Sequence, residues 1–481
     1  MNWLLLSSIV YCMVLIVVCL KILYATHDTN KTLAYLLFCI FIPVIGILFY
    51  TTFGVNYWHK RKYSKKSARD VAILDQLQSG IAGYNDVIVL RNAATLQQNS
   101  ELVSLLVRDL GSPLTKNNEV KLLVNGEQKF PEMMEAIRQA KHHIHIEYYI
   151  YEYDNTGSSL VDLLIEKATQ GVEVRFIYDD FGSPSINNKT EARMQAAGIQ
   201  IYPFHKIKFY LLANRINYRN HRKIVIIDGG TAFVGGINVS DRYVNAGENE
   251  MYWRDTHLRI DGPAVYYLQY LFMSDWNFCC SETLQAKACY FNCTVNESAE
   301  SYVQIAASGP DSLLPSVLYS ILQVIYLAKE EILVTTPYFI PGESIIDALS
   351  VAALSGLKVK LLVPGVSDST FVNAASKSYY DRLLQAGVEI YLYQKGFVHA
   401  KTIVTDSKLC VVGTANMDNR SFELNFEVNA IVYDAKVAQQ MRQLFLDDLQ
   451  HALKINKEEW LTRPWFVKFP EKIARLFSPV M

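Results

Sequence analysis

The chain has 481 residues, which is enough for two or three structural units that each bury a core of their own. Hydrophobic residues make up 51% of it and charged residues 19%, so it is more apolar than a typical soluble protein, and we expect part of it to lie in lipid. The 46 Lys and Arg residues are balanced by 47 Asp and Glu residues, and the resulting net charge of −1 argues against a nucleic-acid partner.

Two uncharged apolar runs open the chain. The first extends from Trp3 to Leu20 and the second from Thr32 to Phe53. Each is long enough to cross ~30 Å of hydrocarbon as a helix, so residues 1–57 are predicted to form a hairpin of two transmembrane helices. Because the second run contains Pro43 and Gly46, a re-entrant hairpin is the alternative to two full spans.

A basic segment follows the second apolar run. It extends from Lys60 to Arg69, within the range 58–110 that we interpret as a juxtamembrane linker. Basic residues stay on the cytoplasmic side of a membrane, so a hairpin would leave both termini and the rest of the chain in the cytoplasm. The same residues can contact anionic lipid headgroups. The sequence therefore predicts a multi-pass membrane protein whose main body is cytoplasmic.

The rest of the chain divides into two similar halves, residues 111–300 and 301–481. The segments "HHIHIEYYIY" and "EILVTTPYFI" are rich in β-branched and aromatic residues and predict strands. A helical stretch follows each of them, around Leu160 to Thr169 and Ile345 to Leu354, and then a glycine and another short apolar strand. This alternation predicts an α/β sandwich in each half, with largely parallel or mixed sheets. We expect the two halves to face each other as one body with pseudo-two-fold symmetry.

The halves share a motif that carries chemically active residues. "HRKIVIIDGGTAFVGGIN" and "HAKTIVTDSKLCVVGTAN" match without a gap, 178 positions apart. The first contains His221, Lys223, Asp228 and Asn238, and the second contains His399, Lys401, Asp406 and Asn416. Because the same residue types recur in one register, we predict that both copies contribute to a single site.

The paired histidines and lysines are suited to phosphodiester chemistry. Residues two apart on a strand share a face, so the His and Lys of each motif can act on one ligand. One imidazole can attack phosphorus to form a phosphohistidine, while the other protonates the leaving alkoxide and later deprotonates the incoming alcohol. The lysines would neutralise the phosphate oxygens without a metal. Asn238 and Asn416, each just past a glycine-bearing turn, are predicted to bind the substrate phosphate.

Four acidic residues accompany the motifs. Asp255 in "WRDTHL" and Glu427 in "NFEVNA" are predicted to orient the histidines, since a carboxylate commonly holds the second ring nitrogen. Asp228 and Asp406 lie an odd number of positions from their lysines, so on a regular strand they point to the opposite face. We predict that these two cap the following turns and belong to the site only as motif members.

Two other clusters resemble metal sites. The first consists of His142, His143 and His145. No carboxylate pattern completes it, so core packing is favoured. The second consists of Cys279, Cys280, Cys289 and Cys293. Their spacing does not match a zinc knuckle, so free thiols are favoured. We expect neither a metal nor another cofactor.

The doubled H-x-K-x4-D motif, each copy followed by a glycine and an asparagine, resembles the phospholipase D superfamily. Within it, "NYRNHRKIVIIDG", "WRDTHLRIDGPAV", "GTANMDNRSFELNFEVN" and the N-terminal "FIPVIGILFYTTFG" are similar to segments of bacterial cardiolipin synthases. The resemblance implies a phosphatidyltransferase of the bacterial inner membrane that condenses two phosphatidylglycerols into cardiolipin and glycerol. It further implies that His221 is the nucleophile and His399 the acid and base, although the symmetric motifs do not order them. Gly236 and Thr414 stand where many members have serine, and we expect neither to touch the reacting atoms.

Related reactions share this intermediate. Water as the acceptor would make the chain a phospholipase D that releases phosphatidic acid, and phosphatidylethanolamine or glycerol are other possible acceptors. A nuclease of the superfamily would require a basic groove and no membrane hairpin, which the charge balance disfavours. The expected partners are therefore phosphatidylglycerol, other phospholipids and the lipid bilayer, without nucleic acid, and the sequence makes no prediction of oligomeric state.

Overall fold

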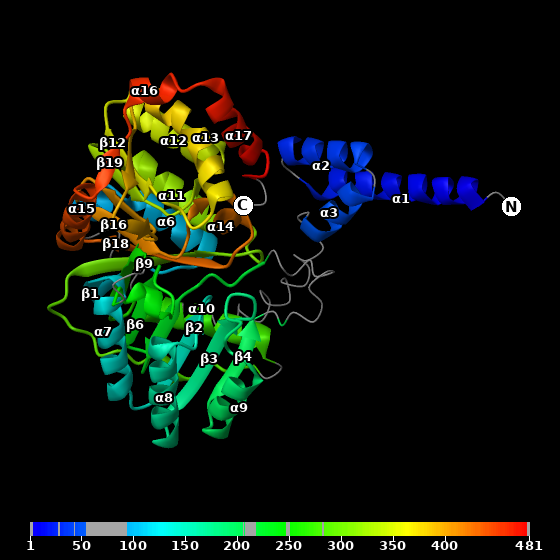
Figure 1. Ribbon diagram of the computed structural model, residues 1–481. Helices are drawn as coiled ribbons and strands as arrows, with labels where there is room; N and C mark the ends of the chain where they lie inside the picture. Colours follow the sequence, from blue (N-terminus) through cyan, green and yellow to red (C-terminus); the bar gives the residue numbers. More distant parts are fainter. Residues whose placement is uncertain are drawn as a thin grey trace.

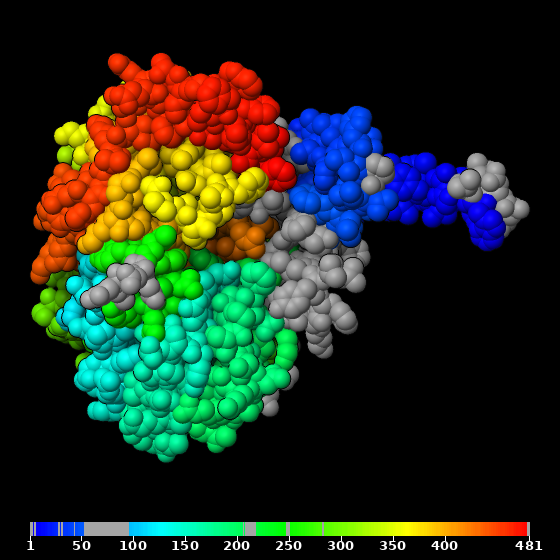
Figure 2. Space-filling view, in the orientation of Figure 1, coloured from blue at the N-terminus to red at the C-terminus, as the bar shows by residue number. Residues whose placement is uncertain are grey.

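The computed structural model describes residues 3–26, 29–42, 44–53, 94–204, 206, 218–246, 251–280 and 283–478. Within them the chain forms a group of N-terminal apolar helices and a larger α/β body (Figures 1 and 2). The basic segment from Lys60 to Arg69 lies outside the described residues.

The N-terminal helices differ from the expected pair of spans. Helix α1 (Trp3–Ala25) is, in the described part of the chain, the one helix long and apolar enough to cross a bilayer. The second apolar run is divided between α2 (Thr29–Phe41) and α3 (Ile45–Phe53). At ~1.5 Å per residue, neither reaches the ~30 Å that a span requires. The prediction of a transmembrane helix therefore holds for α1, and the second run is not one continuous helix.

Aromatic contacts show how α3 lies relative to α2. The rings of Tyr35 and Tyr50 are 5.4 Å apart, and those of Phe38 and Phe49 are 5.1 Å apart. Later residues of α2 thus meet earlier residues of α3, so the two helices run side by side in opposite directions. The structure has the form of the re-entrant alternative.

Fifteen strands of the described chain form one hydrogen-bonded sheet, which divides at the β1–β9 pair into two parts with the same strand order. The first part contains, in spatial order, β1 (Thr115–Val124), β8 (Thr256–Asp261), β6 (Thr231–Gly235), β5 (Ile224–Ile227), β2 (His143–Tyr148), β3 (Glu173–Asp179) and β4 (Gln200–Phe204). The second contains β9 (Ser301–Ser308), β18 (Glu427–Tyr433), β16 (Leu409–Gly413), β15 (Thr402–Thr405), β10 (Glu331–Thr335), β12 (Lys358–Pro364), β13 (Glu389–Tyr393) and the extra edge strand β19 (Ala452–Lys454). In both parts three parallel strands are followed by antiparallel ones, which confirms the mixed sheets and the internal repeat.

The two parts of the sheet pack face to face. Their junction is irregular, because the β1–β9 register shifts between the pairs at Thr115 and Asn118. Strand β6 contacts both β16 and β18 across the interface. Apolar side chains from both halves, such as Val234 and Val412, share one buried core there. The halves therefore form one body, as the repeat predicts.

Helices complete a layered sandwich in each half (Figure 1). The outer face of the first part carries α7 (Asn125–Gln139), α8 (Asn155–Thr169) and α9 (Asn188–Ala196). The outer face of the second part carries α11 (Ser316–Leu327), α12 (Glu343–Leu354) and α13 (Thr370–Ala386). Helices α10 (Val265–Cys279) and α15 (Ala435–Leu449) contribute to the core between the two parts.

Short elements complete the described fold. They are α5 (Ala94–Gln97), β7 (Tyr252–Arg254), β11 (Phe339–Ile340), β14 (Gly396–Val398), β17 (Met417–Asp418), α14 (Asn419–Glu423), α16 (Lys457–Leu461) and α17 (Trp465–Arg475). Helix α6 (Ser100–Leu110) lies in the range interpreted as a linker, yet Leu102 and Leu106 are buried in the core of the second half. The α/β body therefore includes residues that precede position 111.

Candidate active site

Each motif histidine lies against a carboxylate from the other half of the chain. Nδ1 of His221 is 2.9 Å from Glu427, and Nδ1 of His399 is 2.6 Å from Asp255. An ionised carboxylate can only accept a hydrogen bond, so Nδ1 carries the ring proton and Nε2 keeps its lone pair. The sequence predicted both carboxylates as histidine partners, and the structure adds that the pairs cross between the halves.

Short backbone pairings hold the crossed pairs in place. The His-x-Lys segments precede β5 and β15 rather than lying within them. Strand β14 ends just before His399 and pairs with β7, and the N–H of His399 donates to the carbonyl of Arg254 at 2.7 Å. In the other pair, Asn220 bridges to Phe426, whose carbonyl accepts from the N–H of His221 at 2.9 Å. The backbone thus brings each histidine alongside its partner carboxylate.

The motif lysines are buried beside their histidines. The Nζ of Lys223 donates to the carbonyl of His221 at 2.7 Å, and that of Lys401 donates to the carbonyl of His399. Burial lowers the pKa of Lys223 to about 7 and that of Lys401 to about 8, although nearby carboxylates oppose the shift. The positive charge of Lys401 also lowers the pKa of Lys223, so the two motifs lie within electrostatic reach of each other.

The surroundings of both histidines favour the neutral imidazole. Burial is the main cause, and it lowers the pKa of His221 to about 4 and that of His399 to about 3. The lysine of the opposite half contributes in each case: Lys401 acts on His221, and Lys223 acts on His399. Each histidine therefore lies within electrostatic reach of the lysine of the other half.

Gly236 and Thr414, which stand where many members of the superfamily have serine, lie next to the carboxylates of the crossed pairs. The hydroxyl of Thr414 donates to Oε2 of Glu427 at 2.5 Å. At the equivalent place, a Cβ on Gly236 would lie 2.1 Å from Oδ1 of Asp255, so no side chain fits. Burial opposes ionisation of both carboxyl groups, but their cationic neighbours outweigh it, so the pKa values of Asp255 and Glu427 lie below their ordinary range. Gly236 and Thr414 thus adjoin the groups that orient the histidines.

The two motif asparagines have different surroundings. Nδ2 of Asn238 donates to the hydroxyl of Tyr243 at 2.8 Å, and its Oδ1 accepts from the N–H of Ile150 at 3.2 Å. The buried Oδ1 of Asn416 accepts no hydrogen bond from the described residues. Asn238 therefore already holds the loop after β2, and a phosphate could use only its second amide hydrogen.

Asp228 and Asp406 lie at the far ends of β5 and β15 from the histidines. Each carboxylate accepts three consecutive backbone N–H groups at 2.8 to 2.9 Å, from residues 141–143 for Asp228 and residues 329–331 for Asp406. Both residues have a left-handed backbone, with φ of 52° and 53°. We expected each aspartate to cap the turn that follows it. Each instead binds the backbone at the start of the neighbouring strand, β2 for Asp228 and β10 for Asp406.

Aromatic rings enclose the histidines. The ring of Tyr149 is 4.9 Å from His221, and the Nζ of Lys223 lies 5.5 Å from the centre of the same tyrosine. The ring of Trp253 is 5.3 Å from His399. The sequence did not predict either ring near a histidine, because nothing in the spacing of the 30 tyrosines distinguishes Tyr149.

Asp179 is a further residue near the motifs that was not predicted from the sequence. Its carboxylate accepts the N–H of Asn220 at 3.1 Å and lies 3.7 Å from the guanidinium of Arg219. Burial raises the pKa of Asp179 to about 6, although Arg219 opposes the shift. The residue thus fixes the segment that leads into His221. Its place at the carboxyl end of a buried parallel strand, in "YDD", was the available signal.

The other clusters noted in the sequence lie away from the motif histidines. His143 and His145 are buried in β2, where their ring nitrogens lie 3.3 and 3.1 Å from Oε1 of Gln269 on α10. The four clustered cysteines are free thiols. Among the described residues, no group of three or more His, Cys, Asp or Glu side chains is arranged to hold a metal ion.

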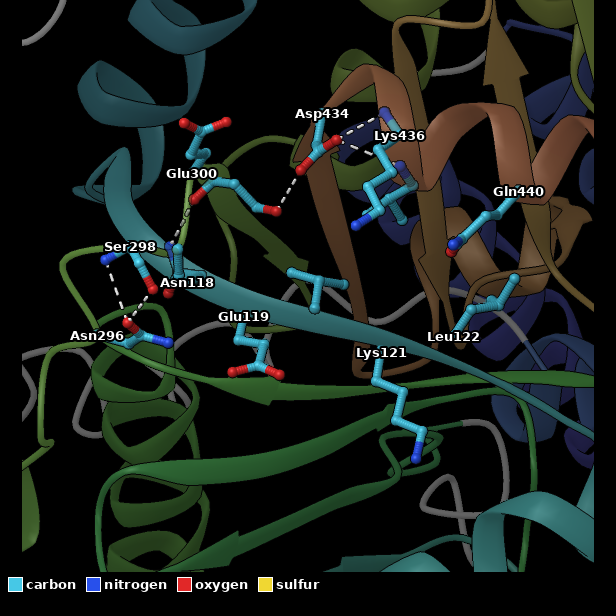
Figure 3. Close-up of a pocket in the computed structure, with 14 residues that line it drawn as sticks. Asn118, Glu119, Lys121, Leu122, Asn296, Ser298, Glu300, Asp434, Lys436 and Gln440 are labelled. Atoms are coloured by element: carbon cyan, nitrogen blue, oxygen red, sulfur yellow. Dashed lines mark hydrogen bonds between the residues drawn. The ribbon is translucent and has the colours of Figure 1, made fainter.

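Two open cavities lie outside the site. One, of about 650 Å³, is lined by polar side chains of β1 and α15, including Asn118 and Lys436 (Figure 3). The other, of about 800 Å³, contains Asp228. Neither is lined by His221 or His399, whose exposed fractions are 8% and 7%.

The chain is similar to known proteins over nearly its whole length. The family model described as "Cardiolipin synthase, PLD-like domain" matches residues 133–276 and 321–449, and "Phospholipase_D-nuclease N-terminal" matches residues 9–54. The cardiolipin synthase of Geobacillus kaustophilus is 41% identical over 466 residues, covering 97% of this chain and 92% of the relative. The major cardiolipin synthase ClsA of Bacillus subtilis is 39% identical over 456 residues, covering 95% of this chain and 94% of the relative.

A solved structure supports the fold. The phosphatidylserine synthase of Haemophilus influenzae superposes with a TM-score of 0.60 at 14% identity, over 81% of this chain and 100% of that one. The family model matches more than half of the chain, and the relatives match nearly all of it. The chain therefore belongs to the cardiolipin synthase family of phospholipase D-like proteins.

Proposed function

We propose that this chain is a cardiolipin synthase, a phosphatidyltransferase that converts two phosphatidylglycerol molecules into cardiolipin and glycerol. The observation that carries the proposal is the pair of crossed histidine–carboxylate contacts, which prepares two imidazoles for the same phosphorus atom. The names of the nearly full-length relatives support the choice of substrate.

In the first step, Nε2 of His221 attacks the phosphorus of one phosphatidylglycerol. A P–N bond forms as the P–O bond to the terminal glycerol breaks, and His399 donates a proton to the departing oxygen. Glu427 stabilises the positive charge that develops on His221. The products are free glycerol and a phosphatidyl group on His221.

In the second step, the headgroup hydroxyl of another phosphatidylglycerol gives its proton to His399. The alkoxide oxygen attacks phosphorus, the P–N bond breaks, and cardiolipin leaves with His221 neutral again. Lys223 and Lys401 neutralise the equatorial phosphate oxygens in both steps. Asn238 and Asn416 donate amide hydrogens to the same oxygens.

The low histidine pKa values suit this order of events. A neutral His221 is ready to attack. His399 must be protonated before it can act as an acid, yet burial and the charge of Lys401 lower its pKa to about 3. A phosphodiester anion between the lysines offsets the positive charge that lowers this pKa, so substrate binding favours uptake of the required proton.

We further propose that the protein lies in the bacterial cell membrane with its catalytic body on the cytoplasmic side. Helix α1 provides the anchor, since it is long and apolar enough to cross the bilayer. The basic segment from Lys60 to Arg69 favours the cytoplasmic side for the body that follows it.

The test is product analysis in vesicles of radiolabelled phosphatidylglycerol that also contain phosphatidylethanolamine. We expect cardiolipin and glycerol from the full-length protein, and neither product from His221→Ala or His399→Ala. His451→Ala, which alters an exposed histidine outside the motifs, provides the matched control and retains full activity. Phosphatidic acid as the main product would instead identify a hydrolase, and a phosphatidylethanolamine adduct a different acceptor.

A covalent intermediate distinguishes the two histidines. Rapid acid-free quenching followed by peptide mass spectrometry locates the phosphatidyl group. We expect it on His221, and its recovery on His399 would reverse the two roles.

A further inference from the structure

Helix α17 presents its apolar side to the outside and its charged side to the protein. Six apolar residues of α17 and of the turn that follows it are exposed: Trp465, Phe466, Phe469, Ile473, Leu476 and Phe477. Their spacing of three, four and seven places them on one face of a helix. The exposed fractions of Trp465 and Leu476 reach 75% and 76%. A helix on the surface of a water-soluble domain has the opposite orientation.

Ion pairs fix this orientation. Lys468 donates to Asp381 of α13 at 3.1 Å. Glu471, only 7% exposed, accepts two hydrogen bonds from Arg463 at 2.8 and 3.0 Å. The guanidinium of Arg475 lies 4.8 Å from the ring centre of Tyr379. Because these contacts commit the polar side of α17 to the body, rotation cannot bury the aromatic side.

The apolar face continues onto neighbouring elements. Phe477 contacts Phe371 of α13, with ring centroids 5.6 Å apart, and Phe371 is itself exposed. Lys472 is exposed next to the apolar face, where it can reach an anionic headgroup. Tryptophan, phenylalanine and lysine together are typical of a helix that lies in the headgroup region of a bilayer.

The apolar face of α17 lies on the same side of the body as the N-terminal helices and close to the second motif. Figure 2 shows the C-terminal segment, in red, on the side of the body that carries the N-terminal helices, in blue. The residues after α17 are tied to α14, because Nδ2 of Asn419 donates to the carbonyl of Ser478 at 3.1 Å. Asn419 is three residues from the motif residue Asn416. The apolar face therefore lies beside the catalytic motif and on the anchored side.

We infer that α17 is a second membrane attachment, which lies flat in the headgroup region of an anionic bilayer and holds the entrance of the active site at the lipid surface. Its partner is the bilayer itself. This inference rests on the proposed function in one respect, namely that the substrate is a membrane lipid. Helix α1 attaches the chain to the bilayer at one place, and α17 adds a second contact that determines which side of the body faces the lipid.

The first test compares two substrates with full-length proteins. Phe466→Gln/Phe469→Gln weakens the apolar face without touching an ion pair. We expect a roughly tenfold rise in the apparent KM for phosphatidylglycerol in mixed vesicles with phosphatidylcholine. Turnover of dibutanoyl-phosphatidylglycerol below its micellar concentration, which needs no bilayer, stays unchanged. Val295→Gln/Leu453→Gln, which alters exposed apolar residues elsewhere on the body, matches wild type on both substrates.

The outcomes separate this inference from the proposed function. An unchanged vesicle KM, or an equal loss on both substrates, would overturn the membrane role of α17. A changed oligomeric state with an unchanged vesicle KM would assign the face to a second copy of the chain and would also overturn it. Wild-type protein that forms no cardiolipin from either substrate would refute the proposed function instead.

A second measurement does not depend on activity. Brominated lipids quench tryptophan fluorescence over short distances, and Trp465→Phe removes one tryptophan while keeping the face apolar. We expect lipids brominated near the headgroup to quench wild type more than Trp465→Phe, and Trp460→Phe, which alters a partly buried tryptophan on α16, to behave as wild type. Equal quenching of wild type and Trp465→Phe would contradict the inference.

Discussion

Glu427 lies 2.9 Å from Nδ1 of His221, although 206 residues separate them in the chain. Asp255 and His399 repeat the relationship in the opposite direction, at 2.6 Å. Each half therefore supplies the histidine of one pair and the carboxylate of the other. In the proposed mechanism, chemistry at either histidine depends on both halves.

The crossed pairs predict the effect of Glu427→Gln. A glutamine amide can donate to Nδ1, which favours the ring form with its proton on Nε2 and removes the lone pair that attacks phosphorus. We expect kcat for cardiolipin formation to fall by about 10²- to 10⁴-fold with an unchanged melting temperature. Glu459→Gln, at an exposed position on α16, controls for loss of a carboxylate. An unchanged kcat would contradict the orienting role.

Asp406 is predicted to affect stability rather than turnover. Asp406→Ala removes three hydrogen bonds that the backbone N–H groups of residues 329–331, at the start of β10, donate to the Asp406 carboxylate. We expect a loss of about 3 kcal/mol in the free energy of unfolding, seen as a lower melting temperature in detergent. The turnover of the protein that remains folded should match wild type. A hundredfold lower kcat at an unchanged melting temperature would instead place Asp406 in the chemistry.

The local elements and the site motifs were predictable from the sequence because their signals are local. "HHIHIEYYIY" contains β2, and the stretch around Leu160 to Thr169 lies within α8. The constant spacing between the motifs identified both His-x-Lys segments. Residue type alone pointed to Asp255 and Glu427, since a histidine that attacks phosphorus needs its other nitrogen held.

Other features depend on contacts that no local pattern encodes. The crossing of the two pairs follows from the β7–β14 pairing, whose strands are over 140 residues apart in sequence. The return of α3 along α2 depends on ring contacts such as that between Tyr35 and Tyr50. An apolar run of that length looks the same whether it is straight or folded back, so the sequence alone favoured a full span.

Substrate affinity is predicted to fall with rising pH. A phosphodiester carries one negative charge throughout pH 6 to 9, so only the protein titrates in that range. Because the pKa of Lys223 is about 7 and that of Lys401 about 8, the site loses positive charge as the pH rises through these values. We expect the KM for dibutanoyl-phosphatidylglycerol to rise by about tenfold between pH 6 and pH 9. A constant KM would show that the lysines stay charged.

Lys129 is predicted to reduce stability at neutral pH. Its side chain is fully buried on α7, and its Nζ has no hydrogen-bond partner among the described residues. Burial lowers its pKa well below 10.5, so the unfolded chain binds a proton at pH 7 that the folded chain does not. Stability therefore increases as the pH rises toward 10.5 and decreases as it falls.

Lys129→Met removes this proton linkage while keeping the side-chain volume. We expect a higher melting temperature than wild type at pH 7, with the difference shrinking as the pH approaches 10. Thermal unfolding of both proteins in detergent at a series of pH values provides the measurement. Lys457→Met, at an exposed position, should show no such pH-dependent difference. A variant less stable than wild type at pH 7 would refute a neutral Lys129.

The folded-back α2 and α3 predict the side of the membrane on which the chain begins. If α1 crosses and the α2–α3 hairpin does not, the N-terminus faces the outside and the catalytic body faces the cytoplasm. A reporter active only outside the cytoplasm should therefore function at the N-terminus and fail at the C-terminus. Cytoplasmic location of both ends would mean that α2 and α3 straighten to cross the bilayer.

The crossed histidine–carboxylate pairs also bear on biosynthesis. A ribosome completes His221 while Glu427 is still more than 200 codons away, and it completes Asp255 long before His399. In the proposed mechanism, a nascent chain that has already entered the membrane therefore carries no oriented histidine until the second half has been synthesised.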